Sequence, residues 1–368
     1  MIPVCTPMIG AKEKQYVNDC LDSNWISSSG KYIKAFEESF SKYCGSDYGI
    51  TTTNGTTALH LAMAAIGIKK GDEVIMPSFT IASVPFAVVY CGGKPVFVDS
   101  QADTWNIDPL RIEKKITKRT KAIVVVHVYG HPCDMDPIMK IAQKHKLIVV
   151  EDAAEAHGAE YKGRKVGGIG RVACFSFYAN KIITTGEGGM VVTSDKKIAE
   201  QCRLLRNLSF IEPRFWHKEL GFNHRMTNIQ AAIGLAQFEQ IDDLIERRRR
   251  NAHLYNSLLK NIPGITLPAE RPGCKNVYWM YSILIGKEYG LKREALMGAL
   301  KEKGIETRTF FISLHNQPIA KKMGYFTKER FLVSNDISKR GLYLPSGGDL
   351  KQSDIEYVCD CIKQLRGK

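Results

Sequence analysis

Three segments of the chain carry residue types that together suit an anionic aromatic cofactor. In the first, residues 52–59, Gly55 permits a tight turn between an expected strand and an expected helix. The start of a helix offers free backbone N–H groups and a positive dipole end to an anion, and the Thr56 hydroxyl adds a donor. Alone this segment is weak evidence, because many helices are capped by threonine and bind no ligand.

The second segment places two carboxylates, Glu151 and Asp152, after the apolar run at residues 147–150. In open α/β sheets, ligands bind at the carboxyl ends of the strands. An ionised Asp152 buried at that edge needs a partner, and the protonated nitrogen of a pyridine ring is one. An N-cap role for Asp152 at a following helix is the alternative.

The third segment carries Lys181, which follows the apolar residues 173–178 and precedes a glycine-rich turn at residues 186–189. Partial desolvation lowers the pKa of such a lysine and makes its amine nucleophilic. Ser176 adds a further hydroxyl for a phosphate. Taken alone, a lysine near a strand end is usually a solvated surface residue, and the glycines are typical of simple turns.

The combination is more specific than its parts. Chemistry with pyridoxal phosphate (PLP) needs a phosphate anchor, an acid for the pyridine nitrogen and a lysine that forms a Schiff base. The chain supplies them in that order at Gly55, Asp152 and Lys181. We therefore predict a PLP enzyme in which Lys181 and Asp152 are the catalytic residues.

Alternating strand and helix patterns are expected to position these residues. Buried strands are predicted at residues 73–76, 95–98, 122–126 and 147–150, and helices at residues 57–66, 109–116 and 136–145. This alternation indicates an α/β domain with a mostly parallel sheet. Beyond it, a charged helix at residues 240–259 and a strand at residues 278–285 indicate a smaller α+β domain. For 368 residues we expect two domains, 1–240 and 241–368.

Composition bounds the remaining possibilities. We find no signal peptide, and the apolar runs are shorter than the roughly 20 residues of a membrane helix. We therefore expect no membrane partner. The ten cysteines form no CxxC pair, so we expect free thiols in a cytoplasmic enzyme and no metal site. The net charge of +14 is typical of a nucleic-acid-binding protein or of an enzyme with anionic substrates. We interpret the arginines at residues 247–250 as a solvated helix face and expect no nucleic-acid partner.

Four segments resemble the DegT/DnrJ/EryC1/StrS family of sugar aminotransferases: residues 53–62, 151–158, 175–181 and 225–228. The similarity runs from Ile2 to near the C-terminus. It implies PLP fold type I, the aspartate aminotransferase-like α/β fold, whose mostly parallel central sheet is flanked by helices and followed by a smaller C-terminal α+β domain. It also implies a cofactor that cycles between PLP and pyridoxamine phosphate (PMP), and a homodimer with shared active sites.

The resemblance also implies residue roles. Gly55, Thr56 and Ser176 hold the phosphate, and Asn228 reaches the phosphate of the neighbouring subunit's cofactor. Asp152 pairs with the ring nitrogen. Glu155 meets the ring hydroxyl oxygen, where many relatives have Gln. Ile81 packs against the ring, where many relatives have an aromatic side chain.

The implied reaction moves an amino group from glutamate to C4 of a 4-keto-6-deoxy nucleotide sugar. Residues 25–32, 103–108 and 223–228 resemble members that act on GDP-linked sugars, which favours GDP-4-keto-6-deoxymannose; UDP- and dTDP-linked sugars are the alternatives. Arg308 and His315 are candidates to contact the diphosphate or the sugar. The alternative for Arg308 is a loop cation packed on an aromatic ring. Trp216 and His217 could lie near the sugar, or they could be buried in the protein.

Three further interpretations compete with this one. Related sugar dehydratases carry His at the position of Lys181, so the lysine argues against dehydration. A PLP-fold protein without catalysis would not need both Asp152 and Lys181. A basic nucleic-acid-binding protein remains an alternative that salt-dependent DNA binding without cofactor colour would favour.

Overall fold

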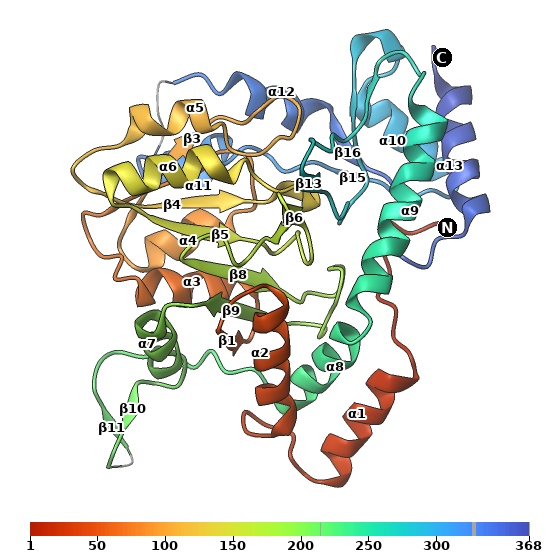
Figure 1. Cartoon of the computed structure of the whole chain (residues 1–368). Coiled ribbons are helices and arrows are strands. Elements are labelled where there is room, and N and C mark those ends of the chain that lie inside the picture. The colour runs from red at the N-terminus through yellow and green to blue at the C-terminus, as the bar shows by residue number, and fades with distance from the viewer. Residues whose placement is uncertain (214, 326–328, 368) are drawn as a thin grey trace.

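A seven-stranded sheet forms the centre of the protein (Figure 1). The structure is a computed structural model, which describes residues 1–213, 215–325 and 329–367. Its strands, in spatial order, are β1 (Tyr48–Thr52), β9 (Gly189–Thr193), β8 (Val172–Ser176), β5 (Ile148–Asp152), β4 (Thr120–Val126), β2 (Glu73–Pro77) and β3 (Lys94–Val98). Neighbouring strands run parallel except at β9, which is antiparallel to both β1 and β8. The predicted mostly parallel sheet is confirmed.

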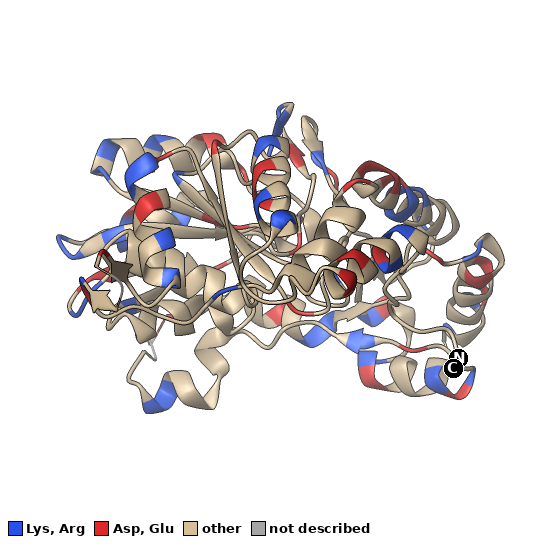
Figure 2. Ribbon diagram, turned by 90° about the horizontal axis from the view of Figure 1, so that it is seen from below, with Lys and Arg blue, Asp and Glu red and all other residues tan. Residues whose placement is uncertain are grey.

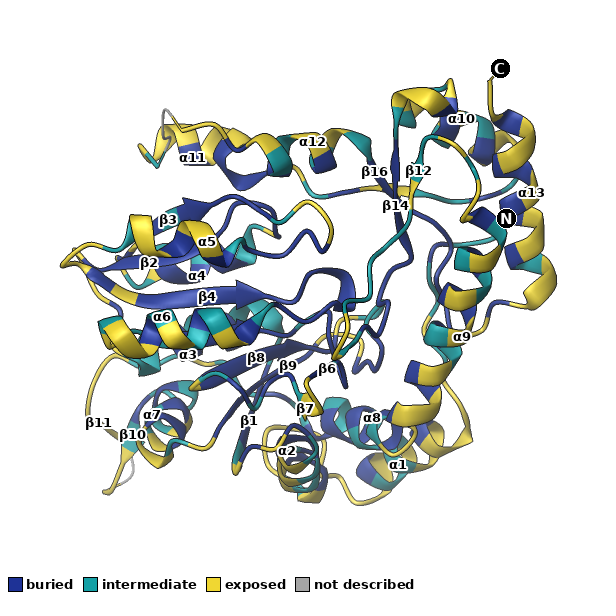
Figure 3. Cartoon of the chain, turned by 45° about the horizontal axis from the view of Figure 1, so that its top comes forward, coloured by how far each residue is buried: buried dark blue, intermediate teal, exposed yellow. Residues whose placement is uncertain are grey.

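Helices cover the sheet, and Figure 3 shows the strands buried between them. All residues of β2, β8 and β9 are buried, which explains why such strands are continuous apolar runs in the sequence. The helices of this part are α3 (Gly55–Ala65), α4 (Ser83–Tyr90), α5 (Pro109–Ile112), α6 (Met135–His145) and α7 (Lys196–Arg206). The helix predicted at residues 109–116 is shorter than expected, because α5 gives way to a 3₁₀ turn, Glu113–Lys115.

Three further helices pack beside the sheet: α1 (Ala11–Asp22), α2 (Lys31–Tyr43) and α8 (Asn228–Phe238). They lie together at the lower side of Figure 1. From there the long helix α9 (Ile241–Leu259) leads to the C-terminal elements. The helix predicted at residues 240–259 is thus confirmed.

The C-terminal part contains a second, antiparallel sheet. Its strands are β12 (Ile265–Thr266), β14 (Ser282–Ile285), β16 (Gly341–Tyr343) and β15 (Arg308–Thr309). A second buried cluster joins this sheet to α9, α10 (Arg293–Glu302) and α13 (Gln352–Leu365). The strand predicted from residue 278 begins only at Ser282, because Tyr278 has a φ of 47°, which extended backbone does not allow. The division at residue 240 stays a prediction.

The remaining elements are short. They are the helices α11 (Pro318–Lys322) and α12 (Leu332–Arg340), the strands β6 (Glu160–Tyr161), β7 (Arg164–Lys165) and β13 (Cys274–Lys275), and the hairpin of β10 (Phe210–Ile211) and β11 (Trp216–His217). Figure 2 shows Lys and Arg spread over many elements, with Asp and Glu between them. Within the described ranges, none of the helices combines the length and apolar character needed to cross a membrane.

Candidate active site

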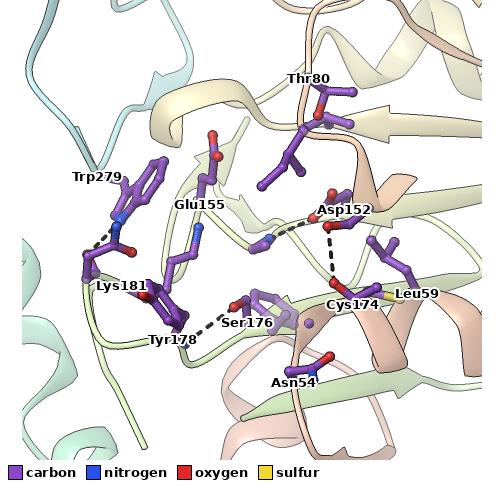
Figure 4. A pocket seen from close by; sticks show the side chains of 18 of the residues that line it. Asn54, Leu59, Thr80, Asp152, Glu155, Cys174, Ser176, Tyr178, Lys181 and Trp279 are labelled. Carbon is purple, nitrogen blue, oxygen red and sulfur yellow. Dashed lines mark hydrogen bonds between the residues drawn. The ribbon is translucent and has the colours of Figure 1, made fainter. Parts of the chain in front are cut away.

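A cavity of about 470 Å³ lies where β5 and β8 end and α3 begins (Figure 4). Eight residues that the sequence singles out line it: Gly55, Thr56, Ile81, Asp152, Glu155, Ser176, Lys181 and Arg308. They come from segments separated by up to about 250 residues, and the sheet brings them together because its strands end at one edge.

Lys181 extends into this cavity from the turn that follows β8. Its backbone N–H bonds the carbonyl of Tyr178 at 2.9 Å, and its Nζ lies 3.7 Å from the centre of the Trp279 ring. In Figure 4 the side chain points toward Glu155. Burial lowers the pKa of Lys181, Arg248 lowers it further, and Glu155 and Asp152 oppose the shift. A neutral, nucleophilic amine is therefore favoured more than at a solvated lysine.

Asp152 is the last residue of β5, and only 3% of it is exposed. One carboxylate oxygen accepts the N–H of Ala154 at 3.1 Å within a turn, so Asp152 does not cap a helix. Burial raises the pKa of Asp152, while the Ala154 N–H, Lys181 and His127 oppose the rise. A carboxylate with so little solvation is matched by a cationic donor placed in the cavity, such as a pyridinium N–H.

The start of α3 forms an anion cradle with the end of β8. Asn54 caps the helix by accepting the Thr57 N–H at 2.9 Å. The N–H groups of Gly55 and Thr56 belong to the first helical turn, which provides no backbone acceptor for them. The Thr56 hydroxyl donates to the Ser83 hydroxyl at 3.1 Å, so the start of α4 adds a third hydroxyl-bearing segment that the sequence did not indicate.

Close packing makes glycine necessary in this cradle. A Cβ at Gly55 would lie 2.7 Å from the Ser176 Cβ and 3.1 Å from its Oγ. The helix start and the Ser176 hydroxyl therefore meet only because residue 55 has no side chain. The donors present, the two N–H groups and the Ser176 hydroxyl, fit a phosphate.

Gly55→Ala is expected to weaken PLP binding about 10- to 100-fold, because overpacking of this kind costs about 1–3 kcal/mol. Titration of the cofactor-free chain with PLP, followed by absorbance, measures the effect. Gly298→Ala in α10 is the matched control, since its new Cβ meets nothing within 4 Å. Unchanged PLP affinity in the Gly55 variant would show that the cradle does not bind the phosphate.

Glu155 is buried beside Lys181, with 5% of its surface exposed. One of its oxygens accepts the backbone N–H of Tyr129 at 2.8 Å, and Tyr129 holds a φ of 55° to present that donor. Burial raises the pKa of Glu155 to about 7, and Asp152 adds to the rise, while Lys181 and the Tyr129 N–H oppose it. Glu155 can therefore carry a proton near neutral pH, which Gln at this position cannot release.

Replacing Glu155 by Gln should remove a pH dependence of folding stability. Because the pKa of Glu155 is higher in the folded chain than its ordinary 4.5, the folded chain binds the extra proton between 4.5 and about 7. Stability from this group is present below that range and is lost as the pH rises through it. Melting curves of the cofactor-free chains from about pH 4 to pH 8 should show the wild type losing stability relative to Glu155→Gln. Parallel curves would contradict the shifted pKa.

The other predicted residues differ in their placement. Ile81 is 46% exposed and lines the cavity beside buried Thr80. Arg308, on β15, also lines the cavity, and its guanidinium pairs with Glu306 at 3.2 Å. Half of the Arg308 side chain is exposed, which leaves donors open to a ligand. Its contact with substrate stays a prediction.

His315 does not line the cavity. Its Nδ1 lies 2.6 Å from the Ser78 hydroxyl, its Nε2 lies 3.1 Å from the Asn335 side-chain oxygen, and its ring stacks on Phe331. Both ring nitrogens therefore have partners within the chain. A role for His315 in binding substrate stays a prediction.

Asn228 also lies apart from the cavity. Its side chain accepts the Tyr32 N–H at 3.1 Å and donates to the Trp25 carbonyl at 2.7 Å, which fixes the connection between α1 and α2. Its reach to a second subunit stays a prediction. Trp216 and His217, for which burial was one possibility, are exposed on the β10–β11 hairpin.

Sequence reasoning missed aromatic residues that complete the cavity wall, among them Trp279 and Tyr343. Both come from the C-terminal part of the chain and are nearly buried. Only a long-range contact with Lys181 distinguishes Trp279 from other aromatic residues in the sequence, so no local signal was present.

The matching family model confirms the resemblance. Residues 7–363 match the DegT/DnrJ/EryC1/StrS aminotransferase family. The chain belongs to this family. Among family relatives, the GDP-perosamine synthase of Escherichia coli O157:H7 is 45% identical over 366 residues, which cover 99% of this chain and 98% of that protein.

Solved structures of sugar aminotransferases share the fold. DesV of S. venezuelae, in complex with a reaction intermediate, has a TM-score of 0.90 and 36% identity over 96% of this chain and 94% of DesV. The PLP form of a putative sugar aminotransferase from Streptococcus pneumoniae has a TM-score of 0.94 and 25% identity, covering 99% of this chain and 98% of that chain. PLP fold type I and PLP as the cofactor, as predicted, are thereby confirmed.

Proposed function

We propose that this PLP-dependent aminotransferase moves an amino group from glutamate to C4 of GDP-4-keto-6-deoxymannose, forming GDP-perosamine. The observation that carries the proposal is the convergence of Lys181, Asp152 and the phosphate cradle in one cavity. The choice of sugar is supported by the full-length similarity to the E. coli GDP-perosamine synthase.

The cavity residues suit each part of the cofactor. The N–H groups of Gly55 and Thr56 and the Ser176 hydroxyl would hold its phosphate. Asp152 would hold the ring nitrogen in its protonated state, and Glu155 would face the ring hydroxyl. When bound, PLP supplies an electron-accepting ring that stabilises the charge left when a Cα–H bond is broken.

Lys181 would serve both to attach the cofactor and to move a proton. Its lowered pKa leaves Nζ free to accept the proton from Cα of the amino donor and to return it to the cofactor carbon. Trp279, which is 5% exposed, packs its ring against one side of Nζ. The same residues would run the second half of the cycle in reverse, with the keto sugar as acceptor.

Substrate anions would meet Arg308 at the cavity wall. Its guanidinium is half exposed, so it can pair with the diphosphate of a nucleotide sugar while Glu306 holds its other edge. His315 would contribute by supporting Ser78, whose hydroxyl it contacts.

We also propose that the chain works as a homodimer with shared active sites. Large apolar side chains are exposed on the α1–α2 connection, Trp25 and Ile26, and on and beside the β10–β11 hairpin, Trp216 and Leu220. Exposed apolar groups of this kind suit an interface with a second copy. Asn228, which anchors the α1–α2 connection, would then position it against the partner.

A single-turnover assay tests the choice of sugar. The enzyme is loaded with PMP and mixed separately with 4-keto-6-deoxy sugars linked to GDP, UDP or dTDP, and the return of PLP absorbance is followed. Fast return only with GDP-4-keto-6-deoxymannose supports the proposal. Return with a UDP- or dTDP-linked sugar instead would overturn the GDP specificity, and return with none would overturn the proposed substrate class.

A further inference from the structure

Arg248 is buried at a place where a solvated arginine was expected. It lies in the run at residues 247–250 on α9, which we interpreted as an exposed helix face; that interpretation is wrong for Arg248, since 5% of it is exposed. Arg250, two residues along, is exposed. Burial of a cation is costly unless hydrogen bonds or opposite charges compensate for the lost solvation.

The guanidinium of Arg248 is held by neutral acceptors from four segments. One nitrogen donates to the Trp279 carbonyl at 2.7 Å and the Ser346 carbonyl at 3.1 Å. The other donates to the Cys5 sulfur at 3.4 Å and the Lys181 carbonyl at 3.5 Å. No carboxylate forms an ion pair with Arg248 in the described part of the chain, so its positive charge is not neutralised locally.

These contacts connect Arg248 to the backbone at Lys181 and to Trp279. The Lys181 carbonyl is one of the acceptors, and Asn180, the preceding residue, accepts the Trp279 indole N–H at 2.8 Å. Trp279, whose carbonyl Arg248 also holds, places its ring 3.7 Å from the Lys181 Nζ. Arg248 therefore fixes both the backbone that carries the lysine and the ring that covers its amine.

We propose that Arg248 is a positioning residue for Lys181, which orients the lysine through its backbone and through Trp279 and keeps an unneutralised positive charge behind the amine. The proposal rests on the proposed function, because it assigns Lys181 the reactive amine. The lowered pKa of Lys181 agrees with it, since Arg248 is one cause of that shift.

The charged and titratable groups around Lys181 come from several elements. Asp152 at the end of β5 and Glu155 just after it favour the protonated amine, whereas Arg248 on α9 disfavours it. His157 is fully buried and its pKa is lowered to about 3 by burial, so it adds no charge near neutral pH. Arg248 is thus the cation that opposes the two carboxylates.

Acylation of Lys181 measures this effect without any substrate. The full chain, stripped of cofactor, is treated with acetic anhydride over a range of pH, and the rate at Lys181 is read by peptide mass spectrometry. Arg248→Met should shift the pH midpoint of acylation upward, whereas Arg250→Met removes a charge from the same helix and should not. An unshifted midpoint in folded Arg248→Met would overturn the electrostatic part of the proposal.

Arg248→Lys separates the effect of the positive charge from the effect of the guanidinium's hydrogen bonds. It also tests the proposal if Arg248→Met does not fold. Lysine keeps the charge but cannot bridge several carbonyls with a planar fork. We expect an unchanged acylation midpoint, a kcat lowered about 10- to 100-fold and little change in KM, because small misplacements of a reacting group have effects of this size. Wild-type kcat in Arg248→Lys would overturn the positioning role. The acylation result does not depend on which sugar is the substrate, so failure here is distinct from failure of the proposed function.

Discussion

Lys181→Ala is expected to lower kcat at least about 10⁴-fold, because the variant loses both the attachment of the cofactor and the base that moves the proton. The two losses share one atom, Nζ, which the cavity holds 3.7 Å from the Trp279 ring centre. No other lysine lines the cavity to replace it among the described residues. Multiple-turnover assays with glutamate and the keto sugar measure the loss.

Two controls accompany the Lys181 variant. Lys301→Ala removes an exposed lysine from α10 and should leave kcat unchanged. PLP should still bind to the Lys181 variant through the cradle and Asp152, with a changed absorbance, which shows that the chain is folded. Substantial multiple turnover in this variant would refute the double role of Lys181.

Asp152→Asn is expected to lower kcat about 10²- to 10³-fold. Removing one member of a buried ion pair costs about 3–5 kcal/mol, and about 1.4 kcal/mol corresponds to a tenfold change in rate. The amide is nearly isosteric with the carboxylate and keeps an oxygen for the Ala154 N–H, so packing changes little. The loss of kcat therefore measures the effect of the carboxylate's negative charge, which asparagine cannot offer to the ring nitrogen.

The matched control for this charge is Asp360→Asn on α13, an exposed carboxylate that pairs with Lys363 at 3.2 Å. It should leave kcat within about twofold, because exposed ion pairs contribute little. A wild-type kcat in Asp152→Asn would mean that the ring nitrogen is not held by this carboxylate, and the assignment of the acid would have to change.

The parts of the site that the sequence predicts are those with local signals. Asp152 and Lys181 lie at or just after the end of a short apolar strand, and Gly55 lies in a Gly/Thr turn that opens a helix, so residue type and position together indicate their roles. The parallel sheet then brings them to one edge without further information. The strands β2 to β5 were predictable for the same reason, since burial on both faces leaves a continuous apolar run.

The parts that the sequence does not predict depend on contacts between distant segments. Trp279 and Arg248 act through Lys181, which lies 98 and 67 residues away in the numbering of the chain. Arg248 has the same residue type as the partly buried Arg247 and Arg249 and the exposed Arg250, so only its tertiary burial distinguishes it. The strand expected from residue 278 fails because the positive φ of Tyr278 is set by its surroundings, including the Asn276 side chain that accepts its N–H at 2.8 Å.

The attachment of the cofactor to Lys181 is tested most directly by chemical trapping. The holoenzyme is reduced with borohydride, digested and analysed by mass spectrometry for the peptide that carries the mass of the reduced cofactor. We predict that this mass lies on Lys181 alone and that prior removal of the cofactor abolishes it. A cofactor mass on another lysine, or none in a chain that shows PLP absorbance, would contradict the account of the site.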